Sequence, residues 1–238
     1  MTGFATVVFD CDCTLVGIEG IDELAGPYRE QVAALTDAAM RGEVPLEEVY
    51  GRRLALIRPT RAQVDEIGRQ YVRTLVPDAR EVVAALLWLK KDVRILSGGV
   101  RPAVDAVAAE LAIADDHVAA VGLRFSTAGE YEGFEDDSPL AASGGKARVL
   151  AGWDLPRPAL LVGDGATDRE ARPAVDAFAA YMGVEFRPAV AAGADHVLRD
   201  PSLAPVLALA CTAGDRERLS GSPWAHLLAR GYELLRAG

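Results

Sequence analysis

Three short segments rich in acidic and small residues each follow an apolar run that is typical of a buried strand. The segments are Asp10 to Thr14, Ser97 to Gly99, and Gly163 to Asp168. In an open α/β sheet the carboxyl ends of the strands meet along one edge, and ligands bind just beyond that edge. We therefore expect the three segments to form one site.

The carboxylates of these segments indicate a bound cation. Asp10, Asp12 and Asp164 would be costly to desolvate, and they would repel one another if they converged without a positive charge. Oxygen ligands that leave room for water and a phosphate suit Mg²⁺ better than Zn²⁺. Each aspartate alone could instead cap a helix, but the same chemistry at several strand ends favours a Mg²⁺ site.

The spacing of Asp10 and Asp12 is suited to phosphoryl transfer. Two residues apart at an extended strand end, their side chains would fall on the same side. A carboxylate beside a metal can attack phosphorus to give an acyl phosphate, while a second carboxylate protonates the leaving alkoxide and then activates water. Asp10 is the candidate nucleophile, and Asp12 is the candidate acid and base.

Two further segments could bind the phosphate. Ser97 to Gly99 is expected to follow a strand and open a helix, where a hydroxyl and backbone N–H groups suit phosphate oxygens. Taken alone, such a segment is more often only a tight turn. Gly144 to Lys146 places a cation at the start of a helix, where the helix dipole disfavours it unless an anion is nearby. We expect Lys146 to contact the phosphate.

The spacing of the glycines excludes two nucleotide-binding motifs. A P-loop would need glycine at Leu140 and Ser or Thr at Ala147. The Rossmann dinucleotide fingerprint fails because Asp168 stands in place of its third glycine. Neither nucleotide motif is supported.

The pattern of apolar residues predicts an α/β protein with a helical insertion. Residues 5–9 form a β-branched run typical of a strand buried on both faces, and residues 18–76 have helical periodicity broken by Gly and Pro. Alternating helical and strand-like runs then indicate a mostly parallel sheet. The later predicted elements are a hairpin formed by 118–125 and 131–134, and strands near 159–162, 177–181 and 196–198.

Composition excludes several classes of function. The chain has 238 residues, a formal net charge of −10 and a pI of about 4.8, with no basic patch, so we expect no nucleic-acid partner. Its apolar runs stop well short of the roughly 20 residues of a membrane span, and its first residues do not resemble a signal peptide. Three cysteines without a CxxC pair fit a reducing compartment. We predict a cytoplasmic protein.

The motifs and their order resemble those of the haloacid dehalogenase superfamily. The matching segments are Asp10 to Thr14, Ser97 to Gly99, Gly145-Lys146, and Gly163 to Asp168. Four more segments resemble the phosphoserine phosphatases of that superfamily, namely 19–25, 53–57, 129–134 and 143–146. The resemblance spans roughly residues 5 to 200.

The resemblance implies a Rossmann-like α/β core with a parallel sheet and a small helical cap inserted after the first strand. We expect residues 1–16 and 77–202 to form the core and residues 17–76 to form the cap. Residues 203–238, outside the resemblance, are expected to form a C-terminal helical extension.

The resemblance also implies a metal site. Mg²⁺ would be bound by Asp10, by the backbone carbonyl of Asp12, and by Asp164. Lys146 would offset the charge of a phospho-aspartate formed on Asp10. Asp168 would orient Lys146 and the metal-bound water.

The implied substrate is a small phosphomonoester, with L-phosphoserine as the first choice. Ser97, Gly98 and Lys146 would contact its phosphate, and Glu19 and Arg53 would hold its amino and carboxylate groups. Without the resemblance, Glu19 and Arg53 could equally be a solvated pair on the cap. The expected reaction is hydrolysis to L-serine and phosphate through a phospho-aspartate, in L-serine biosynthesis.

Two departures from the family pattern leave alternatives open. Cys13 stands where Ser or Gly is usual, and Leu46 stands where many relatives have an aromatic residue. A smaller apolar wall at Leu46 could admit phosphohomoserine or phosphoethanolamine. Two other classes of function are alternatives. A dehalogenase would share the fold but would not need Asp12 or a metal, and a catalytically silent binding protein would not need the full set of charged groups. A monomer or a homodimer is expected.

Overall fold

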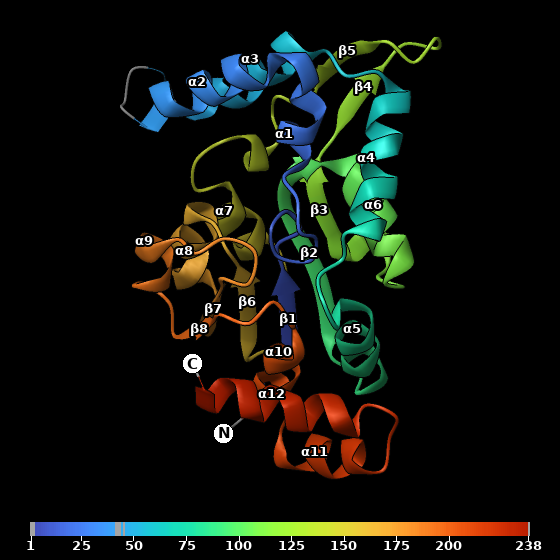
Figure 1. Ribbon diagram of the computed structural model, residues 1–238, viewed down its shortest axis with the longest axis vertical. Helices are drawn as coiled ribbons and strands as arrows, with labels where there is room; N and C mark the ends of the chain where they lie inside the picture. The colour runs from blue at the N-terminus through green and yellow to red at the C-terminus, as the bar shows by residue number, and fades with distance from the viewer. Residues whose placement is uncertain (1–2, 41–43, 45, 238) are drawn as a thin grey trace.

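The core of the protein is a six-stranded parallel sheet in the order β3-β2-β1-β6-β7-β8 (Figure 1). The computed structural model describes residues 3–40, 44 and 46–237, and for 36–40, 46 and 47 it describes the backbone alone. The predicted α/β class with a parallel sheet is confirmed. The strands are β1 (Thr6–Phe9), β2 (Asp92–Val100), β3 (Val118–Val121), β6 (Ala159–Gly163), β7 (Ala177–Tyr181) and β8 (His196–Leu198).

Both faces of the sheet are buried because its strands carry apolar side chains on both sides. Val7 and Phe9 of β1 belong to one apolar cluster, and Val8, which points the opposite way, belongs to the other. Helices α5, α6 and α10 supply residues to the first cluster, and α7, α8 and α9 supply residues to the second. Their bounds are α5 (Ala79–Trp88), α6 (Arg101–Glu110), α7 (Gly145–Gly152), α8 (Ala166–Ala171), α9 (Pro188–Ala191) and α10 (Ala204–Ala210).

A group of helices between β1 and β2 lies beyond the carboxyl ends of the strands (Figure 1). Its two connections to the sheet run side by side, because Gly17 N–H donates to the Thr74 carbonyl at 2.9 Å and Val76 N–H donates to Leu15 at 3.0 Å. The boundaries predicted for the cap, residues 17 and 76, stay predictions. The helices are α1 (Gly20–Ala25), α2 (Arg29–Met40), α3 (Leu46–Ile57) and α4 (Arg61–Arg73).

The predicted hairpin was partly wrong. Its first half divides in two, because Val118 and Val121 are buried and pair with β2 as an edge strand of the main sheet. Only β4 (Leu123–Phe125) pairs with β5 (Tyr131–Phe134) in an antiparallel hairpin. This hairpin extends to the inserted helices, where Phe134 contacts Tyr50 of α3.

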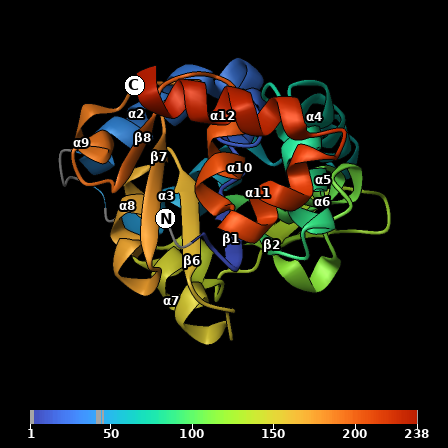
Figure 2. The same cartoon turned by 90° about the horizontal axis from the view of Figure 1, so that it is seen from below.

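The C-terminal segment covers the end of the molecule opposite the inserted helices (Figures 1 and 2). Every residue of α10 is buried, and the carbonyl of Ala210 accepts the Phe4 N–H at 3.0 Å. Helices α11 (Ala213–Ser220) and α12 (Ala225–Ala237) pack outside it. Among the described helices, none is long and apolar enough to cross a membrane.

Candidate active site

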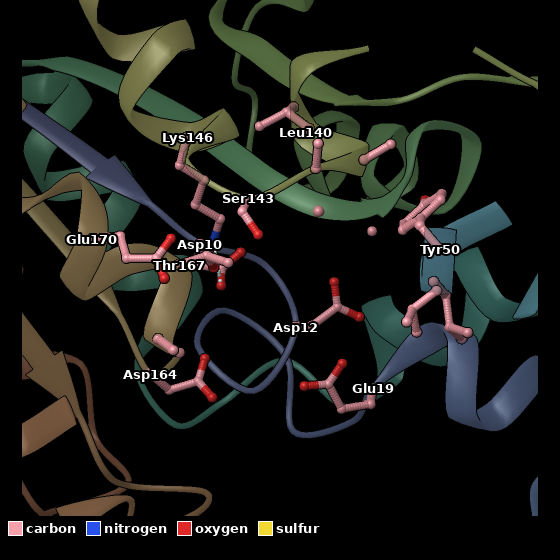
Figure 3. A pocket seen from close by; sticks show the side chains of 18 of the residues that line it. Asp10, Asp12, Glu19, Tyr50, Leu140, Ser143, Lys146, Asp164, Thr167 and Glu170 are labelled. Atoms are coloured by element: carbon pink, nitrogen blue, oxygen red, sulfur yellow. Dashed lines mark ion pairs between the residues drawn. The ribbon is translucent and has the colours of Figure 1, made fainter. Parts of the chain in front are cut away.

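A cavity of about 360 Å³ lies between the carboxyl edge of the sheet and the inserted helices (Figure 3). The sequence-predicted residues that line it are Asp10, Asp12, Glu19, Arg53, Gly98, Lys146 and Asp164. Two others, Ser97 and Asp168, are fully buried and contact lining residues. The structure thus brings all of the predicted site residues together in one region.

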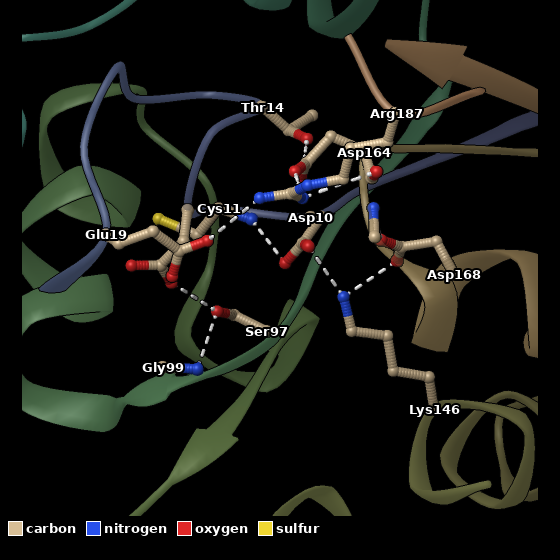
Figure 4. Close-up of polar contacts among 12 residues, drawn as sticks. Asp10, Cys11, Thr14, Glu19, Ser97, Gly99, Lys146, Asp164, Asp168 and Arg187 are labelled. Carbon is tan, nitrogen blue, oxygen red and sulfur yellow. Dashed lines mark hydrogen bonds and ion pairs between the residues drawn. The ribbon is translucent and has the colours of Figure 1, made fainter. Parts of the chain in front are cut away.

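Lys146 links two carboxylates at the centre of the site (Figure 4). Its Nζ lies 2.7 Å from Asp10 Oδ2 and 2.7 Å from Asp168 Oδ1. Burial alone would lower the pKa of Lys146, but the charges of Asp10 and Asp168 raise it above its usual range. The predicted helix start is confirmed, since Lys146 is in the first turn of α7. The amine therefore stays charged and fixes both carboxylates.

Asp12 is held by residues of both the sheet and the insertion. Ser97 Oγ donates to Asp12 Oδ2 at 3.1 Å, while Gly20 N–H donates to Oδ1 at 2.8 Å. The Tyr71 hydroxyl, which comes from α4, donates to the same Oδ1. Burial raises the pKa of Asp12, although the hydrogen bond from Tyr71 opposes this shift. Asp12 is therefore a candidate for holding a proton.

The local backbone differs from the sequence prediction in two places. Asp10 to Thr14 is not an extended strand end: β1 ends at Phe9, and a turn with Cys13 at a φ of +51° brings Asp10 and Asp12 to the cavity. Ser97 to Gly99 does not open a helix, because β2 continues to Val100 and α6 begins at Arg101. Gly99 N–H bonds to Ser97 Oγ at 2.9 Å, which satisfies the amide locally.

Asp164 follows β6 and contacts Thr14, the last residue of the first predicted segment, and Arg187, which the sequence did not single out. Thr14 Oγ1 donates to Asp164 Oδ1 at 3.0 Å, and the Arg187 guanidinium forms an ion pair with Oδ2. Arg187 also lies 3.8 Å from Glu19. Burial and the charge of Asp10 raise the pKa of Asp164 to about 6. The acidic cluster thus carries excess negative charge.

The donor set of this cluster fits a hard cation. Carboxylate oxygens of Asp10, Asp164 and Asp168 lie within 4.8 Å of one another, and all three residues are buried. The Asp12 carbonyl accepts no hydrogen bond from the described backbone, so its oxygen is free to act as a ligand. A second group, Cys13 with Glu19 and Asp164, contains one thiol, but oxygen ligands dominate and suit Mg²⁺.

The inserted helices supply the other end of the cavity. Glu19 precedes α1, with 44% of its side chain exposed, and Arg53 lies on α3. Tyr50, one turn before Arg53, also lines the cavity. The proposed wall residue Leu46 lies outside the described side chains. Among the described residues, Arg53 Nε is buried without a hydrogen-bond partner, so this end of the cavity offers a positive, unpaired donor.

Sequence reasoning missed Arg187, Tyr71 and Tyr50. A signal existed for Arg187, because it lies in the loop after β7, and the ends of strands were the places to inspect. Tyr71 and Tyr50 had no such signal, since aromatic residues at helical spacing usually pack in a core. Cys11, Cys13 and Cys211 are buried free thiols, in agreement with a packing role.

A parallel sheet with helices inserted after its first strand, and an aspartate-lysine-aspartate site at its carboxyl edge, defines the haloacid dehalogenase class of fold. Curated phosphoserine phosphatases of Bos taurus and Homo sapiens are each 39% identical over 199 residues, covering 82% of this chain and 88% of each relative. A solved substrate-bound phosphoserine phosphatase has the same fold, with a TM-score of 0.71 at 23% identity over 87% of this chain and 97% of that chain. No family model matches the chain. The chain belongs to the phosphoserine phosphatase family.

Proposed function

We propose that this protein is a Mg²⁺-dependent phosphatase that hydrolyses L-phosphoserine to L-serine and phosphate. The observation that carries the proposal is the position of Lys146, 2.7 Å from both Asp10 and Asp168, next to an Asp12 carboxylate held by Ser97. The 39% identity to phosphoserine phosphatases supports the choice of substrate. The proposal includes a role in L-serine biosynthesis in the cytoplasm.

Asp10 is placed for nucleophilic attack. Its Oδ1 accepts the Cys11 N–H at 2.7 Å and its Oδ2 contacts Lys146, so the carboxylate has one orientation. In the first step a bond forms between Asp10 and phosphorus, the bond from phosphorus to the seryl oxygen breaks, and Asp12 gives its proton to that oxygen. In the second step Asp12 takes a proton from water, whose oxygen attacks phosphorus and releases Asp10 and phosphate.

Mg²⁺ would be held by Asp10, the Asp12 carbonyl and Asp164. When bound, the ion would offset the negative charge of the phosphoryl oxygens. Lys146 offsets part of the negative charge of Asp10, and Asp168 orients Lys146. The Gly98 backbone, which lines the cavity, and Ser97 would contact phosphate oxygens.

The end of the cavity formed by the inserted helices carries two groups of opposite charge that are complementary to an amino acid. Glu19 would bind the substrate amino group, and Arg53 would bind its carboxylate. Both residues line the cavity that also contains Asp10. Arg53→Ala is expected to reduce turnover of L-phosphoserine while sparing phosphoethanolamine, which has no carboxylate.

Release of inorganic phosphate tests the function. L-phosphoserine, phosphohomoserine and phosphoethanolamine would each be assayed with Mg²⁺ and with EDTA, using the wild type, Asp10→Asn and the control Asp116→Asn on an exposed turn. We expect Mg²⁺-dependent release, fastest from L-phosphoserine, that Asp10→Asn abolishes and Asp116→Asn keeps. Release only from the other esters would reject the substrate, and no release from any ester would reject the reaction.

A further inference from the structure

Two buried polar atoms in the described part of the chain have no hydrogen-bond partner. They are the hydroxyl of Tyr50 and Nε of Arg53. Tyr50 is only 6% exposed, so bulk water does not replace the missing partner. Buried donors are nearly always paired, and an unpaired one calls for an explanation. A ligand in the adjoining cavity would supply the acceptor.

Both atoms belong to one face of α3. Tyr50 and Arg53 are three residues apart, a spacing that brings helical side chains together on the same side. Both residues line the active-site cavity. Figure 3 shows Tyr50 across the cavity from Lys146, on the side of the inserted helices. The two donors therefore belong to the end of the cavity that is far from the phosphate-binding residues.

Packing holds the Tyr50 ring in place. Its centroid lies 5.4 Å from that of Phe134, with an angle of 56° between the planes, a tilted arrangement that aromatic pairs favour. Burial raises the pKa of Tyr50, so the side chain is a neutral phenol that can donate a hydrogen bond. The fixed ring presents this donor without the entropy cost of ordering a flexible side chain.

The charges around the cavity indicate which substrate group would accept this hydrogen bond. The carboxyl group of Glu19 favours a cationic substrate group, whereas the guanidinium of Arg53 favours an anionic one, and both residues line the cavity. An anionic oxygen bound by Arg53 would also lie near Tyr50, because the two residues are three apart on the same helix and line the same cavity. The substrate phosphate is expected at the other end, near Lys146, which leaves the carboxylate.

We infer that the Tyr50 hydroxyl donates a hydrogen bond to the substrate carboxylate beside Arg53, and that Tyr50 helps to select phosphorylated amino acids over phosphorylated amines. The inference rests on the proposed function, because it requires a substrate with a carboxylate. The Tyr50 hydroxyl would be a neutral hydrogen-bond donor beside the charged guanidinium of Arg53. Charge alone attracts any anion, whereas two donors at fixed positions favour a planar carboxylate.

The variant Tyr50→Phe tests the inference because it removes the hydroxyl and keeps the ring on Phe134. We expect the ratio of kcat/KM for L-phosphoserine to kcat/KM for phosphoethanolamine to fall roughly tenfold, as a lost hydrogen bond to a charged group predicts. The loss should lie mainly in KM for L-phosphoserine. The thermal midpoint should not fall, because the hydroxyl has no partner in the protein.

The matched control is Tyr131→Phe, which removes the hydroxyl of a neighbouring tyrosine that is also buried but does not line the cavity. This control should leave the ratio unchanged. An unchanged ratio in Tyr50→Phe, or an equal loss in both variants, would overturn the inference while leaving the proposed function intact. If the wild type does not hydrolyse L-phosphoserine, both the inference about Tyr50 and the proposed function would be overturned.

Discussion

Close packing around Asp12 restricts which residues can surround it. A Cβ atom on Gly99 would lie 2.5 Å from Asp12 Oδ2 and 3.0 Å from Ser97 Oγ. A Cβ atom on Gly20 would lie 2.1 Å from the Tyr71 hydroxyl oxygen. The absence of a side chain at these two positions is therefore what allows the hydrogen bonds to Asp12 to form.

Gly99→Ala should impair catalysis more than stability. The added methyl group would displace the Asp12 carboxylate, and a misplacement of about 1 Å can reduce a rate by roughly a hundredfold. We expect kcat to fall by that order with a small change in the thermal midpoint. Gly152→Ala is the control, because a Cβ atom there meets nothing within 4 Å. Wild-type kcat in Gly99→Ala would contradict the role given to Asp12.

At the residue scale, the sequence pattern could predict a site residue where that residue follows an apolar strand or begins a helix. Asp164 and Lys146 were found because a charged group beside an apolar strand or at a helix start is unusual. Tyr50 was not found, because its chemistry lies in the missing partner of its hydroxyl. A missing partner is a property of three-dimensional packing, and no spacing in the chain encodes it.

At the scale of elements, an acidic residue near the start of α11 links this helix to the core. Asp215 and Thr212 form the capping box at the start of this helix. Lys91, which precedes β2, donates to Asp215 Oδ2 at 2.7 Å, with only 9% of its side chain exposed. Burial works against the charged form, but the hydrogen bonds from Lys91 and Thr212 lower the pKa of Asp215.

The lowered pKa of Asp215 predicts how the stability of the protein depends on pH. The ionised carboxylate stabilises the fold fully above its unfolded pKa of about 3.9, and this stabilisation is lost as pH falls through the lower folded pKa. Asp215→Asn should therefore lower the free energy of unfolding by about 2 kcal/mol at pH 7. The difference from wild type should shrink below about pH 4.

Urea unfolding at several pH values measures this difference. The exposed Asp116 provides the control variant Asp116→Asn, which should track the wild type throughout. A difference between Asp215→Asn and wild type that stays constant down to the acid transition would show that the charge of Asp215 does not stabilise α11.

The elements that sequence reasoning misplaced are those decided by long-range pairing. Residues 118–121 and 123–125 have similar apolar patterns, yet β3 pairs with β2 and β4 pairs with β5. The strands β7 and β8 were predicted at their observed positions, because parallel pairing on a doubly covered sheet needs only an apolar run. Which partner an edge strand chooses depends on packing that the local pattern does not contain.

At the scale of the whole molecule, the C-terminal helices and the site lie at opposite ends of the sheet (Figure 1). Helix α12 crosses α10 closely at Gly231, where a Cβ atom would lie 2.3 Å from the Ala204 carbonyl oxygen and 3.0 Å from the Ala208 Cβ. The sequence predicted helices in this segment. It could not show that a glycine is the contact point that lets them cross.

Gly231→Ala should destabilise the protein without changing its chemistry. Forcing α12 away from α10 is expected to cost about 1–3 kcal/mol, as overpacking of a core does. We expect a lower midpoint in urea and an unchanged kcat per folded molecule. Gly221→Ala is the control, since a Cβ atom there meets nothing within 4 Å. A loss of kcat at unchanged stability would mean that this end of the molecule is coupled to the site.

The central claim is that Asp10 becomes phosphorylated during turnover. The most direct measurement mixes the enzyme with L-phosphoserine and Mg²⁺, quenches with acid within one turnover, and analyses the peptides by mass spectrometry. We predict one added phosphoryl group on the peptide that contains Asp10, lost on a longer incubation and missing in Asp10→Asn. Release of phosphate by the wild type with no phosphorylated peptide at any time would contradict the claim.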